Sequence, residues 1–210
     1  MKILPRLLAI LAAFAFAPPS FPATLVRDLG EGLTYYRVHE LPQDQPAPVS
    51  GRPGACVLDL RYAKADEPDA GVLKAWVLFN VSAHKPIFVL ENAQTDPSLL
   101  ATLQARGPPG LIILAPASAK IGADIVVMVS PAGDRQAYDA LEKGAAVTSL
   151  LSDYPDKPRV DEAYLEKEHI ADSESPEQPT DKPPPPRPLV DAMLQRAVQL
   201  HRGLVALKKT

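Results

Sequence analysis

Five short apolar segments of the chain have the length and composition of buried β-strands. Each is bounded by glycine, proline or charged residues, and β-branched and aromatic side chains are frequent in them. They cover residues 33–38, 55–61, 86–91, 111–114 and 124–129. Three further segments carry apolar residues at helical spacing, at residues 69–79, 98–106 and 134–143. We expect Ser98 and Asp134 to cap the second and third helices, and Gly144 to end the third.

The order of these elements predicts the fold class. Strands alternate with helices, and the strands are almost continuously apolar, as in sheets that are covered on both faces. We therefore expect an α/β domain with a mostly parallel sheet over residues 24–151.

The composition changes after this domain. Residues 152–188 contain ten acidic residues and nine prolines, and too few apolar side chains to build a core, so we expect a disordered linker. Residues 189–210 then form an amphipathic helix with a continuous apolar stripe. A single helix of this length is marginal in water, so it must dock. We expect it to fold back onto its own domain, with a partner protein as the alternative and an anionic membrane as the third option.

The first residues have the pattern of an export signal. Lys2 and Arg6 precede an apolar run at residues 7–17, and small residues at Ala17 and Ala23 give two candidate cleavage sites. The run is too short to cross a bilayer as a helix. We expect residues 1–23 to be removed as a signal peptide, which predicts a periplasmic or extracellular protein with no stable membrane span.

Charge and cysteine usage exclude several classes of function. The net charge is −3 and no basic cluster lies outside the C-terminal end, which argues against nucleic acid as a partner. Cys56 is the only cysteine, so no internal disulfide can form. The four histidines are scattered without metal-ligand spacing, and no glycine-rich phosphate loop follows a strand. We expect neither a metal nor a cofactor.

Three segments resemble the core of the tail-specific (C-terminal-processing) serine peptidases. That family has a "GYIRI"-like strand, then "LDLRxNxGG", then "PVVVLVNxxTASASE", and later a glycine-flanked lysine. Here the corresponding segments read LTYYRV at residues 33–38, VLDLR at 57–61 and PIFVLENAQT at 86–95. The resemblance spans about residues 32–128. It implies a ClpP/crotonase-like fold of ββα units.

The catalytic parts of that family can be compared position by position. The position of the nucleophilic serine is Pro97, which has no hydroxyl, and Ser98 follows it. The two glycines that shape the oxyanion site correspond to Ala65 and Asp66, and a carboxylate there has the wrong sign for stabilising negative charge. The base corresponds to Lys120, with a shift of one residue.

The resemblance therefore leads to three hypotheses about function. The first is an exported, non-catalytic pseudo-peptidase that binds a peptide or protein partner in a degenerate cleft. The second is a divergent serine hydrolase with Ser98 as nucleophile and Lys120 as base. The third is an envelope assembly factor that acts through its tethered C-terminal helix. The cleft of the first hypothesis is rimmed by Arg61, Lys64, Asn92, Thr95 and Lys120.

Overall fold

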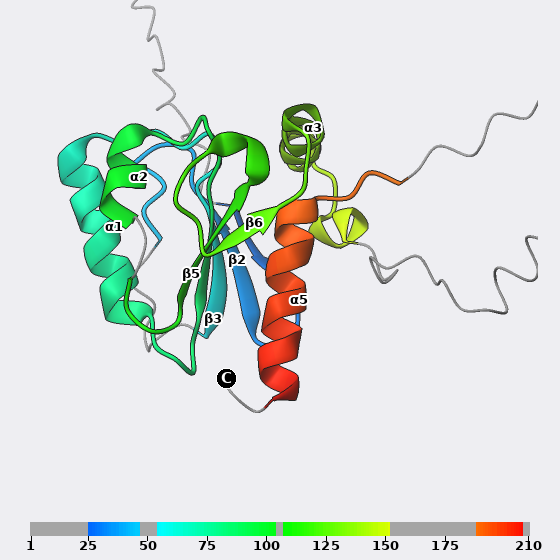
Figure 1. Cartoon of the computed structure of the whole chain (residues 1–210), viewed down its shortest axis with the longest axis horizontal. Coiled ribbons are helices and arrows are strands. Elements are labelled where there is room, and N and C mark those ends of the chain that lie inside the picture. The colour runs from blue at the N-terminus through cyan, green and yellow to red at the C-terminus, as the bar shows by residue number, and fades with distance from the viewer. Residues whose placement is uncertain (1–24, 47–53, 104–106, 152–187, 208–210) are drawn as a thin grey trace, which may run out of the picture.

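A single six-stranded sheet forms the centre of the protein (Figure 1). The computed structural model describes residues 25–46, 54–103, 107–151 and 188–207. The expected signal peptide and almost all of the expected linker lie outside these residues. The strands are β1 (Leu25–Asp28), β2 (Leu33–Arg37), β3 (Ala55–Asp59), β4 (Ile87–Leu90), β5 (Leu111–Pro116) and β6 (Ile125–Val127).

The strands lie side by side in the order in which they occur in the chain. Strands β2 to β6 are parallel, and β1 pairs antiparallel with β2. The prediction of an α/β fold with a mostly parallel sheet is confirmed. Strand β1 was not predicted, because Leu25–Asp28 is a short segment whose last three residues are exposed and carry no buried-strand pattern.

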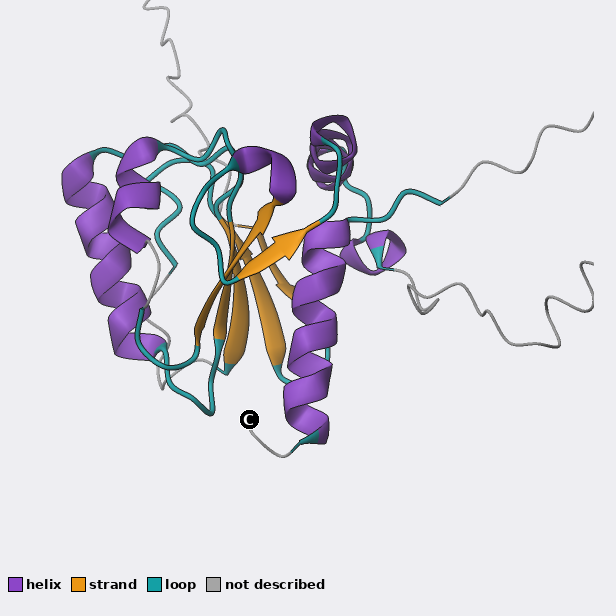
Figure 2. Ribbon diagram, viewed as in Figure 1, coloured by secondary structure: helices purple, strands orange, loops and turns teal. Residues whose placement is uncertain are grey.

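Helices cover both faces of the sheet (Figure 2). Helices α1 (Glu67–Asn80) and α2 (Pro97–Leu103) follow β3 and β4 and pack on one face. Helix α5 (Ala192–Ala206) packs on the other face, and α3 (Pro131–Glu142) lies beyond the carboxyl ends of the strands. Two apolar cores result. Side chains of α1 and α2 pack against Cys56, Leu58 and Val89, while side chains of α5 pack against Tyr35, Val57 and Phe88.

Two helix starts differ from the prediction. Helix α3 begins at Pro131 and is capped by Ser130, whose hydroxyl accepts a hydrogen bond from the backbone of Gly133 at 3.1 Å. The prediction of Asp134 as the cap was wrong, because this carboxylate lies within the first turn and points to a buried arginine. Helix α2 begins at Pro97, and the carboxylate of Asp96 accepts from Ser98 N at 2.9 Å, so the Ser98 hydroxyl is not the cap.

The C-terminal helix docks on its own domain, as its apolar stripe predicted. Met193, Leu194 and Ala197 are fully buried against the sheet, and α5 contacts strands β3 to β6. Its far end is held by His201, whose Nε2 lies 3.0 Å from the carbonyl oxygen of Glu31. Within the part of the chain that the structure describes, no helix has the length and apolar content needed to cross a bilayer.

We predict that removing apolar volume from α5 destabilises the whole domain. Leu194→Ala should lower the free energy of unfolding by about 2–5 kcal/mol, because the leucine is fully buried in the core. Urea denaturation followed by circular dichroism measures the change. Leu207→Ala is the control, since Leu207 is 68% exposed and should change stability by less than about 0.5 kcal/mol. Equal, small effects of both variants would mean that α5 does not stabilise the sheet.

Candidate functional site

Polar and charged side chains gather where the parallel strands end. Strand β2 ends at Arg37 and β3 at Asp59, with Arg61 two residues further on, and Glu91 and Asn92 follow β4. All five are buried. The carboxyl edge of a parallel sheet is where open α/β folds place their ligands, so this cluster is the first candidate for a site.

Arg61 occupies the centre of the cluster and is fully buried. Its Nε and Nη2 donate to the two carboxylate oxygens of Asp59, at 3.0 and 2.7 Å. Nη1 also donates to Asp134 of α3 at 2.8 Å, and Nη1 and Nη2 donate to Asp191, directly before α5, at 3.1 and 2.8 Å. These bonds use all five N–H groups of the guanidinium. Arg61 therefore has no donor left for a ligand.

The charges in the cluster stabilise one another. Burial alone would raise the pKa of Asp59, but the charge and hydrogen bonds of Arg61 and the Tyr35 hydroxyl together hold it below its usual value. Burial also opposes the charged form of Arg61, and the carboxylates of Asp191 and Asp59 outweigh this and raise its pKa. Burial and the neighbouring Asp59 raise the pKa of Tyr35, so its hydroxyl keeps the proton that it donates to Asp59 at 2.7 Å. At neutral pH Asp59 is therefore ionised, Arg61 is charged and Tyr35 keeps its proton.

Three carboxylates that converge in this way resemble the ligand set of a hard cation. Here the guanidinium of Arg61 stands at the point where Asp59, Asp134 and Asp191 meet. Among the residues that the structure describes, no group of three or more histidine, cysteine or acidic side chains could hold a metal ion.

Two residues expected to rim a peptide cleft are also used internally. The side-chain amide of Asn92 donates to Asp134 at 2.9 Å, and its oxygen accepts from Gln94 N. The hydroxyl of Thr95 donates to the carbonyl of Leu60 and accepts from Asn92 N, both at 3.0 Å. Both side chains are buried, so they fix the loop after β4 and do not face an open cleft.

Helix α3 covers the carboxyl ends of the strands through Tyr138, Arg135 and Glu142. The guanidinium of Arg37 lies 3.5 Å from the centre of the Tyr138 ring, and its Nη2 contacts Glu142 at 3.1 Å. The ring of Tyr62 packs against Tyr138 at 4.6 Å, and Arg135 stacks over Tyr62 at 4.5 Å. The strand ends are therefore covered by the protein itself.

Tyr62 also carries backbone strain. Its φ of +64° lies in the left-handed region, which costs a residue with a side chain roughly 1–3 kcal/mol. The adjacent ring of Tyr138, tilted by 59°, and a hydrogen bond from the Tyr62 hydroxyl to Asp134, at 3.2 Å, hold this conformation. Burial and Asp134 raise the pKa of Tyr62 to about 12, so the hydroxyl stays protonated. The turn after β3 is thus locked onto α3.

The residues expected to carry catalysis lie apart from this cluster. Ser98 is half-buried in the first turn of α2, and Lys120 is exposed at the end of the short helix η1 (Ala117–Ala119) with a φ of +55°. No hydrogen bond joins the two side chains, both of which belong to the described residues. Asp66, at the position of an oxyanion-site glycine, accepts from Asp69 N at 2.9 Å and caps α1.

Lys64 is exposed, unlike Arg61, Asn92 and Thr95. It lines a shallow groove of about 240 Å³ together with Glu40, Asp66, Asp69 and Asp96. Its backbone pairs with the neighbouring loop, donating to His39 O and accepting from Leu41 N.

Two buried groups remain outside the network. Burial raises the pKa of Cys56 to about 12, which makes it an inert core thiol. Burial also raises the pKa of Glu91 to about 8, and its Oε1 has no hydrogen-bond partner. Glu91 is therefore largely protonated at neutral pH, and no described residue forms a hydrogen bond with its Oε1.

We predict that replacing Arg61 lowers the free energy of unfolding more than replacing any other residue of the cluster. Arg61→Met leaves three buried carboxylates without their counter-charge, and should lower the free energy of unfolding by about 3–5 kcal/mol or prevent folding. Urea denaturation near pH 7 measures the effect. Arg27→Met on the exposed strand β1 is the control and should change stability by less than about 0.5 kcal/mol. A stable Arg61→Met variant would show that the carboxylates do not need this cation.

We also predict that Glu91 makes stability depend on pH. Its folded pKa of about 8 lies above the ordinary value of 4.5, so its stabilising contribution is complete below about pH 4.5 and is lost as the pH rises toward 8. Glu91→Gln is neutral at every pH and lacks this loss. The free energy of unfolding of the variant, measured relative to that of the wild type, should therefore rise by up to about 1.4 kcal/mol per pH unit between about pH 5 and about pH 8. Urea unfolding across this range tests it, and parallel pH profiles would contradict it.

Comparison with known proteins adds no relative: no family model, no curated protein and no solved structure matches the chain.

Proposed function

We propose that this protein is an exported, non-catalytic relative of the tail-specific serine peptidases that binds a peptide or protein partner. The single observation that carries the proposal is the use of all five Arg61 donors by the protein's own carboxylates. The edge of the sheet where such an enzyme would act is closed by internal bonds.

The arrangement of elements supports the ClpP/crotonase-like part of the proposal. Strands β2 and β3 are followed by α1, and β5 and β6 are followed by α3, so the ββα order occurs twice, with the single strand β4 and helix α2 between the two units. The strands within each unit are parallel neighbours. The two ββα units support this part of the proposal, whereas the β4–α2 pair departs from a strict ββα repeat.

The state of the catalytic positions supports the absence of chemistry. Pro97 opens α2, Asp66 caps α1, and no hydrogen bond connects Ser98 with Lys120. A nucleophile needs a base within hydrogen-bond reach, and an oxyanion site needs converging donors. The loss of several such groups does not leave a proportionate activity, because they act as a unit.

We predict that a fluorophosphonate probe does not label the folded protein. The expected result is no labelling under conditions that label a control serine hydrolase completely, since the Ser98 hydroxyl lacks a base. Ser98→Ala and, as a matched control, Ser118→Ala beside Lys120 are treated in parallel. Labelling that disappears only in Ser98→Ala would establish a serine hydrolase, and labelling that persists in both variants would reveal another nucleophile. Either result overturns the proposal.

A further inference from the structure

Strand β6 is one of the two edge strands of the described sheet, and β1 is the other. Strand β6 pairs with β5 on one side, and no other described strand pairs with it on the other side. Half of the backbone N–H and C=O groups of a strand point to each side, so β6 has outward groups that no described strand pairs with. The Val127 carbonyl is already used, because it accepts from Val129 N at 3.1 Å. Val126 and Met128 are exposed here, at 59% and 85%. Natural edges are usually blunted by charge or proline, and residues 125–128 contain neither.

A groove of about 300 Å³ runs between this edge and helix α5. Val126 and Met128 line its strand side, and Arg196 and Gln199 line its helix side. Val190 lines it near the start of α5. An edge strand that faces a helix across a groove is the geometry that accepts an extended peptide as an additional strand.

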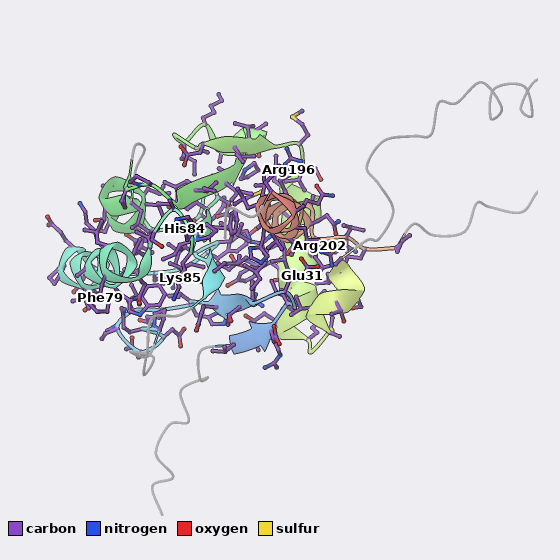
Figure 3. The ribbon with its side chains drawn as sticks, turned by 90° about the horizontal axis from the view of Figure 1, so that it is seen from below. Glu31, Phe79, His84, Lys85, Arg196 and Arg202 are labelled. Carbon is purple, nitrogen blue, oxygen red and sulfur yellow. The ribbon has the colours of Figure 1, made fainter. Side chains whose placement is uncertain are left out.

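The charge of the groove indicates the chemistry of its occupant. Arg196 is the one charged residue among the described residues that line it, and Arg196 is exposed. Figure 3 shows Arg196 on the side of α5 toward the green edge strands, and Arg202 on the opposite side beside Glu31. Arg202 pairs with Glu31 at 3.5 Å, whereas the nearest polar contact of Arg196 is Gln199, at 3.5 Å. A carboxylate in the groove would pair with Arg196.

We infer that the groove between β6 and α5 binds an extended acidic peptide segment by strand addition. The peptide backbone pairs with the outward groups of β6. Its alternate apolar side chains contact Val126 and Met128, and a carboxylate pairs with Arg196. The inference rests on the proposed binding function and moves the site from the closed strand ends to the open edge of the same sheet.

Fluorescence anisotropy with the full chain tests this binding mode. The probe is a fluorescein-labelled peptide, Thr-Val-Glu-Val-Glu-Val-Thr. Two control peptides carry lysine in place of glutamate, or N-methyl groups at alternate residues that remove backbone donors. We expect both controls to bind at least about tenfold more weakly, since each removes one of the two interactions. Arg196→Gln should weaken binding of the acidic peptide by about fivefold or more, whereas the matched variant Arg202→Gln should leave it within about twofold.

The outcomes separate this inference from the proposed function. If the acidic peptide binds with an affinity that neither N-methylation nor Arg196→Gln changes, the groove is not the binding site. This result would overturn the inference and leave the proposed binding function intact. No peptide binding by a chain that sediments as a monomer would also overturn the groove. A dimer that dissociates in Met128→Lys, with no peptide binding, would assign the edge to a second copy and overturn the inference as well. Fluorophosphonate labelling of Ser98 would instead overturn the proposed function, whatever the peptide does.

Discussion

One buried guanidinium connects the parts of this protein that the chain keeps far apart. Arg61 bonds to Asp134, 73 positions away, and to Asp191, 130 positions away. It thereby fixes α3 and the start of α5 against the end of β3. A buried ion pair adds little stability over well-packed apolar groups, but removing one partner is costly. We infer that Arg61 determines where these helices sit more than it adds to the free energy of unfolding.

The same network explains why the carboxyl ends of the strands are covered by the protein itself. Asp191 and Asp134 close the strand ends by meeting Arg61, and the rings of Tyr62 and Tyr138 cover what remains. Asp191 also caps α5 by accepting from Leu194 N at 3.0 Å. The helix that begins there runs along the sheet and forms one wall of the groove at β6. The position of α5 therefore both covers the strand ends through Asp191 and forms a wall of the groove beside β6.

Local patterns were enough to predict strands β2 to β6 and helices α1, α2, α3 and α5, but not strand β1 or the buried network. Apolar runs such as residues 55–61 and the apolar stripe of α5 predict strands and helices, because the spacing of apolar residues within a short segment indicates its secondary structure. Asp59 and Arg61 are only two positions apart, so their ion pair is a local contact. Asp134 was mistaken for a cap, because an acid near a helix start has the same local pattern whether it caps the helix or meets a distant cation. Nothing near Asp191 indicates a partner 130 positions away.

The late position of α5 in the chain has a consequence for how the protein reaches its folded state. The core on the face of the sheet formed by Tyr35, Val57 and Phe88 is incomplete until residues 192–206 have been synthesised. Contacts of such long sequence separation slow folding, and nascent chains that wait for them expose apolar surface to chaperones and proteases. A premature stop codon anywhere before α5 would therefore yield an unfinished core and not a smaller working domain.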